Sequence, residues 1–177
     1  MLTTSSYNMN PKEFLLSIES STIKLGLERT FELMKKCGNP QNNLSLIQIA
    51  GTNGKGSTAA MLSKILECAG YKVGLFTSPH LVEVNERIRI NGEPINNLSI
   101  DEFVKCYKHD IQKINASFFE SITAMGLWYF KKKNVDITVM ETGLGGRLDS
   151  VTICNPILTI ITPISLDHTE ILGSSIE

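Results

Sequence analysis

The sequence predicts an α/β fold in which helices flank a mostly parallel, doubly wound sheet. Short apolar segments with the length of buried strands alternate with longer segments whose apolar residues recur at helical spacing. One strand is joined to the next helix by the glycine-rich segment 51–57, which contains a lysine, so the sheet is of the P-loop type. Polar and glycine-rich stretches follow four predicted strands, at the edge where doubly wound sheets bind ligands.

Two helices are expected before the first strand. The first begins at Asn10, which caps it, with Pro11 in the first turn and Glu13 three residues after the cap. The second covers about residues 27–37 and ends before Gly38.

Residues 44–50 are mostly apolar and predict the first strand, and residues 58–66 have the spacing of a helix. Residues 73–77 predict a second buried strand, which is parallel to the first because a helix connects the two. Residues 81–90 alternate loosely and lead into Asn91-Gly92, a hairpin-turn signal.

Two further helices and two further strands complete the expected sheet. Ser99 to Glu102 has the pattern of a capping box, so we expect a helix from there to about residue 115. A second helix should cover about residues 119–133. Residues 135–142 and 157–161 predict the third and fourth parallel strands.

The bulk composition limits the possible functions. The chain has 177 residues, 42% of them hydrophobic and 20% charged, which is typical of one globular domain. Its net charge of -1 favours neither nucleic acid nor an anionic membrane as a partner. The sequence contains no apolar run of about 18 residues, so no membrane span is expected. A cytoplasmic location is expected because there is no secretory signal and the cysteines, Cys37, Cys68, Cys106 and Cys154, are widely spaced.

The segment between the first strand and its helix predicts a bound phosphate group. Glycines allow successive N–H groups to face one anion, and the helix N-terminus adds partial positive charge. The lysine supplies a full charge and the serine a hydroxyl for Mg2+. The pattern is a variant, G-x-x-G-K-G-S, and a simple glycine-rich connection is the alternative. The candidate nucleotide-binding residues are Gly51, Thr52, Asn53, Gly54, Lys55, Gly56 and Ser57.

Three side chains at neighbouring strand ends are candidate Mg2+ ligands, with Ser57 as a fourth. Glu141 ends the third parallel strand, and Mg2+ prefers such hard oxygen ligands. Ser78 follows the second strand, and His168 follows Asp167 after the fourth. Each also has a structural alternative: a solvent-facing glutamate, a Ser-Pro turn and a structural histidine.

Residues 143–147, Gly-Leu-Gly-Gly-Arg, begin like a dinucleotide-binding fingerprint. Leu148 stands where the third glycine belongs, so we interpret the stretch as a flexible loop that places Arg147 and Asp149 near a substrate.

Taken together, the motifs resemble those of the folylpolyglutamate synthase/dihydrofolate synthase family of the Mur ligase superfamily. The resemblance covers most of the chain in the family's order. It is carried by residues 25–29, 49–57, 69–74, 78–82, 86–88, 91–92, 119–120, 141–149 and 166–169.

The resemblance implies an ATP- and Mg2+-dependent ligase of folate metabolism. ATP would phosphorylate a carboxylate of dihydropteroate or a folate, and the amino group of L-glutamate would attack the acyl phosphate. Lys55, Glu141 and His168 would act in catalysis. By the same resemblance, the pterin substrate would be bound by Lys24, Leu25, Ser117, Leu148, Asp149 and Ser150. Lys24 departs from the acidic residue of some bifunctional members.

The family is usually more than twice as long as this chain. The resemblance therefore assigns residues 1–177 to the N-terminal portion of a Mur-ligase-like ATP-binding domain that is incomplete at the C-terminus, without the C-terminal glutamate-binding domain. We expect the 177 residues alone to be inactive, and the full-length protein to be a monomer. Another Mur-type amino-acid ligase and a non-catalytic nucleotide-binding fragment remain as alternatives.

Overall fold

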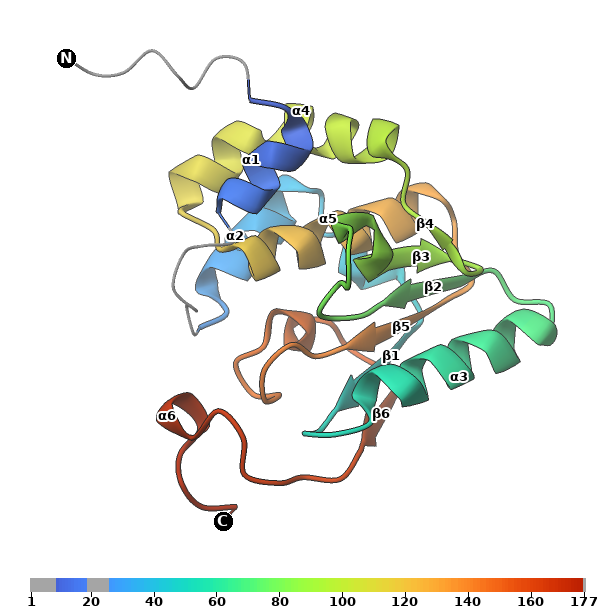
Figure 1. Cartoon of the computed structure of the whole chain (residues 1–177). Coiled ribbons are helices and arrows are strands. Elements are labelled where there is room, and N and C mark those ends of the chain that lie inside the picture. The colour runs from blue at the N-terminus through green and yellow to red at the C-terminus, as the bar shows by residue number, and fades with distance from the viewer. Residues whose placement is uncertain (1–8, 19–25, 177) are drawn as a thin grey trace.

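The computed structural model describes residues 9–18 and 26–176 and contains one six-stranded sheet with the strand order β4-β3-β2-β5-β1-β6 (Figure 1). β1, β2, β5 and β6 are parallel, whereas β3 and β4 are antiparallel to their neighbours. The mixed α/β architecture is the predicted one. The strands are β1 (Leu46–Ala50), β2 (Val73–Phe76), β3 (Ile88–Ile90), β4 (Glu93–Pro94), β5 (Ile137–Glu141) and β6 (Leu158–Ile161).

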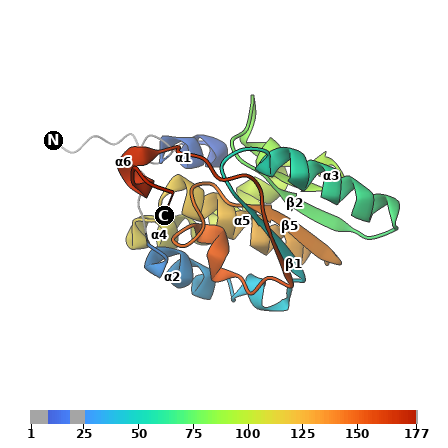
Figure 2. The ribbon, with the colours of Figure 1, turned by 90° about the horizontal axis from the view of Figure 1, so that it is seen from below.

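Helices flank the sheet on both sides. α3 lies on one face, and α2, α4 and α5 lie on the other (Figure 2). The α-helices are α1 (Pro11–Ser17), α2 (Glu28–Lys36), α3 (Lys55–Cys68), α4 (Asn97–Ile114), α5 (Phe118–Lys132) and α6 (Thr169–Leu172). Three short 3-10 helices are η1 (Pro40–Asn43), η2 (Val84–Arg87) and η3 (Ser150–Ile153). Within the described ranges, no helix has the length and apolar character needed to cross a membrane.

The alternation of side chains along the strands produces two cores. Val73 and Leu75 of β2 belong to a small core with Ala59 of α3. Phe76, on the opposite face of the same strand, belongs to the larger core that also contains buried residues of α1, α2, α4 and α5. Both faces of the central strands are therefore buried, as the continuous apolar runs in the sequence predicted.

Local signals explain most of the element boundaries. The capping box of Asn10 and Glu13 opens α1 as predicted. Asn91 and Gly92 have φ values of 48° and 82°, and this pair of positive angles is what a two-residue hairpin turn requires.

The predicted capping box at Ser99 is wrong. α4 begins at Asn97, and the side chain of Asn96 accepts the N–H of Ser99 at 2.9 Å. Ser99 is buried in the first turn. Asn is at least as good a cap as Ser, and its position three residues earlier allows the helix to begin sooner.

β6 forms an open edge of the sheet. It pairs with β1 on one side, and the side chains of Leu158 and Ile161 are 50% and 66% exposed. On the neighbouring helix α3, Met61 and Ile65 are similarly exposed. Apolar side chains are therefore exposed both on this edge strand and on α3.

Candidate active site

Loops that follow the parallel strands meet at one edge of the sheet. Those after β1, β5 and β6 line a pocket of about 560 Å³. Lys55 and His168 both line it, with Gly143 to Arg147 forming another part of the wall. The loop after β2 lies outside the lining of this pocket, although its Ser78 contacts Glu141. Four loops were predicted to meet here. Three of them form the pocket, and the fourth, after β2, adjoins it through the contact of Ser78 with Glu141.

The N-terminus of α3 forms the phosphate-binding part of the site. Gly54 is its N-cap residue and has a φ of 84°, a conformation that favours glycine. The helix starts at Lys55, three residues earlier than predicted, so Gly56 and Ser57 lie in its first turn. Gly54 has no side chain that could cap this end. The first N–H groups of a helix lack acceptors within the helix, so they are available to an anion.

The preceding residues of the loop are bound to the segment after β6. The N–H groups of Thr52 and Asn53 donate to the carbonyl oxygen of Pro163 at 3.1 and 3.4 Å. Thr52 Oγ1 accepts the N–H of Ser165 and donates to its carbonyl, both at 3.0 Å. A Cβ on Gly51 would lie 2.1 Å from Thr162 Oγ1, so only glycine permits this approach. The loop is thereby fixed to the segment that leads to His168.

Lys55, the first residue of α3, contacts the loop that precedes the helix. Its ammonium group donates to the carbonyl oxygens of Gly51 at 2.8 Å and Thr52 at 3.1 Å. Its charge also lowers the pKa of Glu141 against the larger effect of burial. The cation is therefore near both the helix N-terminus and the carboxylate.

Glu141 ends β5 as a buried carboxylate, with 4% of its surface exposed. Oε2 accepts the N–H of Ser78 at 3.1 Å, and a Cβ on Gly56 would lie 3.4 Å from the same oxygen. Burial raises the pKa of Glu141, whereas the Ser78 N–H and the charges of Lys55 and Arg87 lower it. The structure thus brings Ser78, Glu141 and the start of α3 together.

His168 lines the pocket from the segment that follows β6. It has a φ of 47°, precedes α6, and has a half-exposed side chain. Its Nε2 atom is 3.9 Å from Asp167 Oδ2. Among the residues that the structure describes, no group of three or more His, Cys, Asp and Glu side chains is suited to hold a metal ion. The roles of Ser57, Ser78, Glu141 and His168 as metal ligands stay predictions.

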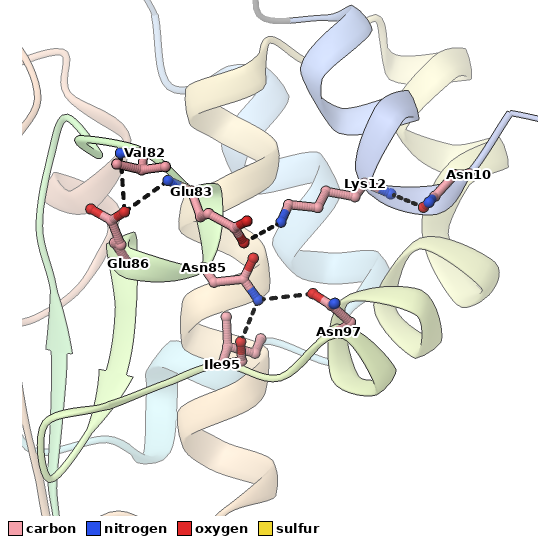
Figure 3. Close-up of polar contacts among 8 residues, drawn as sticks. All are labelled: Asn10, Lys12, Val82, Glu83, Asn85, Glu86, Ile95 and Asn97. Atoms are coloured by element: carbon pink, nitrogen blue, oxygen red, sulfur yellow. Dashed lines mark hydrogen bonds and ion pairs between the residues drawn. The ribbon is translucent and has the colours of Figure 1, made fainter.

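The loop after β2 is held by polar contacts with three elements (Figure 3). The carboxylate of Glu86 accepts the N–H groups of Leu81, Val82 and Glu83, at 3.0, 3.0 and 2.7 Å. These bonds, that of Leu81 first, lower the pKa of Glu86. Lys12 of α1 forms an ion pair with Glu83 at 2.6 Å. The side chain of Asn85 donates to Asn97 at the start of α4 at 3.1 Å. These contacts fix the position of the loop that presents Ser78.

Asp149 organises the loop after β5. Oδ2 accepts the N–H groups of Gly143 and Leu144 at 2.8 and 3.0 Å, and Oδ1 accepts the N–H of Val151 at 2.9 Å. Burial raises its pKa, and these three bonds oppose that rise. Asp149 is 5% exposed, so the structure gives it a role in holding the pocket wall.

The other predicted substrate residues are dispersed around this loop. Ser117 is the N-cap of α5, Ser150 is buried, and Leu148 is exposed. Lys24 and Leu25 lie outside the described residues. Substrate binding by this set, Asp149 included, stays a prediction.

Arg87 is a charged residue at the site to which sequence reasoning gave no role. Its side chain is 6% exposed, its guanidinium lies 5.1 Å from the centre of the Phe118 ring, and its Nε donates to His80 Nδ1 at 2.8 Å. A single sequence gives no signal that an arginine preceding a short strand will be buried.

The chain matches the Mur ligase middle domain over residues 49–177. The chain belongs to this family. It is 42% identical over 162 residues to the dihydrofolate synthase/folylpolyglutamate synthase of Bacillus subtilis (strain 168), covering 88% of this chain and 38% of that protein. With the Escherichia coli (strain K12) protein of the same description the identity is 39% over 160 residues, covering 90% and 38%. The chain therefore spans well under half the length of these relatives.

Solved structures of this group have the same fold. The folylpolyglutamate synthase of Thermotoga maritima matches with a TM-score of 0.80 and 41% identity, over 86% of this chain and 38% of that chain. An FPGS–AMPPCP complex matches with a TM-score of 0.85 and 37% identity, over 94% and 43%. E. coli FolC in complex with DHPP and ADP has a TM-score of 0.84 and 36% identity, over 94% and 41%.

Proposed function

We propose that this chain is part of an ATP-dependent ligase that joins L-glutamate to dihydropteroate or to a folate. The observation that carries the proposal is the uncapped N-terminus of α3, with Lys55 beside it and the buried Glu141 next to Gly56. Such an arrangement suits a polyphosphate with an associated cation. Similar proteins bear the names of folate ligases, and similar structures hold AMPPCP or ADP.

The proposed reaction has two steps. The substrate carboxylate attacks the terminal phosphorus of ATP, which gives an acyl phosphate and ADP. The amine of glutamate then attacks the acyl carbon, and phosphate leaves as the amide forms. Residues 54–57 would hold the phosphates, and Lys55 would stabilise the charge that develops on them. Catalysis would rest mainly on positioning and electrostatics.

The oxygen-bearing side chains near the start of α3 suit a magnesium ion that is bound mainly through the nucleotide. Mg2+ commonly takes one or two carboxylates and completes its coordination with waters and phosphate oxygens. Glu141 supplies a buried carboxylate close to the start of α3, and Ser78 lies beside it. His168 and Ser57 are the further candidate ligands. When bound, the ion would neutralise phosphate charge.

The proposed acceptor site is the region of Ser117, Leu148, Asp149 and Ser150, together with Lys24 and Leu25. Asp149 contributes through the shape of the pocket wall, since its oxygens accept backbone N–H groups.

We further propose that residues 1–177 form the N-terminal portion of the ATP-binding domain, and that sequence outside them supplies the glutamate-binding domain. The coverage of relatives and the exposed edge at β6 support this division. Under this proposal the protein works as a cytoplasmic monomer, and the 177 residues alone do not turn over.

ADP release by the complete natural protein tests the proposal. We expect release that requires both L-glutamate and either dihydropteroate or tetrahydrofolate. Membership of the Mur ligase family also supports a different amino-acid ligase. Turnover with a UDP-muramoyl substrate alone would favour that alternative, whereas nucleotide binding without turnover on any acceptor would indicate a non-catalytic module.

A further inference from the structure

The first turn of α2 is fixed by side chains that reach other elements. Its N-cap residue is Leu27, whose side chain makes no capping hydrogen bond. Arg29 and Thr30 follow directly, and their side chains contact α5 and η3. The position of this helix end therefore affects the positions of both α5 and η3.

Arg29 holds the N-terminus of α5. Its Nε atom lies 3.0 and 3.2 Å from the two carboxylate oxygens of Glu120. Glu120 is 2% exposed, and its Oε2 also accepts the N–H of Ser117 at 2.6 Å. A buried carboxylate in the first turn of a helix is favoured by the helix dipole and here also has a cationic partner. The orientation of Ser117 thus depends on the ion pair.

Thr30 and Phe119 extend these contacts to the wall of the pocket. Thr30 Oγ1 donates to Ser150 Oγ at 3.2 Å, and both side chains are buried. A Cβ on Gly143 would lie 2.6 Å from the ring of Phe119, so this ring packs directly on the loop after β5. The contacts form a closed circuit: α2 contacts α5, α5 contacts the loop after β5, this loop contacts η3, and η3 contacts α2.

We propose that the Arg29–Glu120 pair positions the acceptor substrate by fixing this circuit of contacts among α2, α5, the loop after β5 and η3. This inference rests on the proposed function, because Ser117 and Ser150 belong to the proposed acceptor site. The pair is distant in sequence from the phosphate loop, and the contacts just described involve none of residues 51–57. Arg29 and Glu120 are positioning residues, and their loss should weaken acceptor binding while ATP binding is retained.

The opposite end of α2 provides a matched control. Lys36 forms an ion pair with Asp110 of α4 at 3.7 Å, and both side chains are partly exposed. Breaking this pair removes one ionic contact of the same helix, and neither residue lines the pocket. Asp110→Asn is therefore expected to leave both Michaelis constants unchanged.

A double-mutant cycle in the complete natural protein tests the inference. Arg29→Gln, Glu120→Gln and the double variant are compared for the KM of ATP, the KM of the acceptor and kcat, with thermal unfolding as a check of folding. We expect each single variant to raise the KM of the acceptor about tenfold or more and the KM of ATP less than twofold. The double variant should fall well short of the product of the single effects, because the residues act as a unit. If Arg29→Gln does not fold, Arg29→Lys replaces it, since it keeps the charge but loses the guanidinium geometry.

The possible failures can be told apart. An unmodified protein that releases no ADP with either acceptor overturns the proposed function and this inference together. An active unmodified protein whose folded variants keep the acceptor KM, or raise both KM values equally, overturns the inference alone.

Discussion

Parts of the phosphate loop, residues 51–54, and of the β5–η3 loop, residues 142–149, line the same pocket, but the two loops are held in place differently. The phosphate loop is bonded to the segment after β6, through Thr52 and Asn53. The phosphate loop leads into the N-terminus of α3, where the N-cap residue Gly54 has no side chain to accept the first N–H groups. The β5–η3 loop is closed on itself, because Asp149 accepts three backbone N–H groups and Thr142 Oγ1 donates to Gly145 O. The helix end that follows the first loop therefore offers N–H donors to an anionic ligand, whereas the second loop forms a preorganised wall. Substitutions that affect one loop but not the other can test this difference.

The largest expected effect comes from Lys55→Gln. Removing the cation beside the helix N-terminus should lower kcat about a thousandfold, the upper part of the range for losing one electrostatic contact to a reacting group. Initial rates of ADP release measure it. Lys64→Gln, on an exposed part of the same helix, is the control and should keep full activity. An active Lys55→Gln protein would mean that the loop does not serve phosphoryl transfer.

Glu141→Gln should separate activity from stability. We expect turnover to fall about a hundredfold, because an amide is a poor replacement for a carboxylate metal ligand. Burial raises the pKa of Glu141, because the folded protein favours the protonated carboxyl group. The stability that this provides is fully present below the ordinary pKa of 4.5 and is lost as pH rises through the raised pKa.

The variant should consequently unfold at a higher temperature than the unmodified protein at pH 7 without nucleotide, and this advantage should vanish below about pH 4.5. Thermal unfolding monitored by circular dichroism across pH measures both. A lower Tm for Glu141→Gln at pH 7 would contradict this interpretation of the site.

Asp149→Asn should act mainly on stability. The NH2 group of Asn cannot accept, so at least one buried backbone N–H loses its partner, at a cost of about 2 kcal/mol. Denaturant unfolding measures the loss, and the affinity for an ATP analogue should change less than threefold. The same substitution at Asp101 of α4, which is partly exposed and does not line the pocket, is the control. Unchanged stability would show that the wall does not depend on Asp149.

The smallest expected effect is that of Thr52→Val. It removes the two hydrogen bonds to Ser165 and should cost about 1 kcal/mol of stability with a modest loss of nucleotide affinity. Calorimetric titration with an ATP analogue checks the second part. A hundredfold loss of affinity would instead indicate that the Thr52 hydroxyl binds the nucleotide directly.

Local patterns predicted the fold well because the local and tertiary preferences agree. The cap at Asn10, the turn at Asn91-Gly92 and the apolar runs of the central strands all have the predicted structures. The error at Ser99 arose because two good caps compete within three residues, and packing decides between them.

The candidate site was only partly predictable. The position of Gly51–Ser57 followed from local sequence, because a strand, a glycine-rich turn and a helix are adjacent in the chain. The ion pair of Arg29 with Glu120 joins residues 91 positions apart, and the contact of Thr52 with Ser165 spans 113 positions. Pairings over such distances depend on how the helices pack on the sheet, which periodicity does not specify.

Isotope transfer tests the central claim most directly. The acceptor is labelled with 18O in its reacting carboxylate and incubated with the complete natural protein, ATP, Mg2+ and L-glutamate. We predict that one 18O atom per turnover appears in the released phosphate, as an acyl phosphate requires. Amide product with unlabelled phosphate would contradict the proposed reaction, and so would ADP formation without amide product.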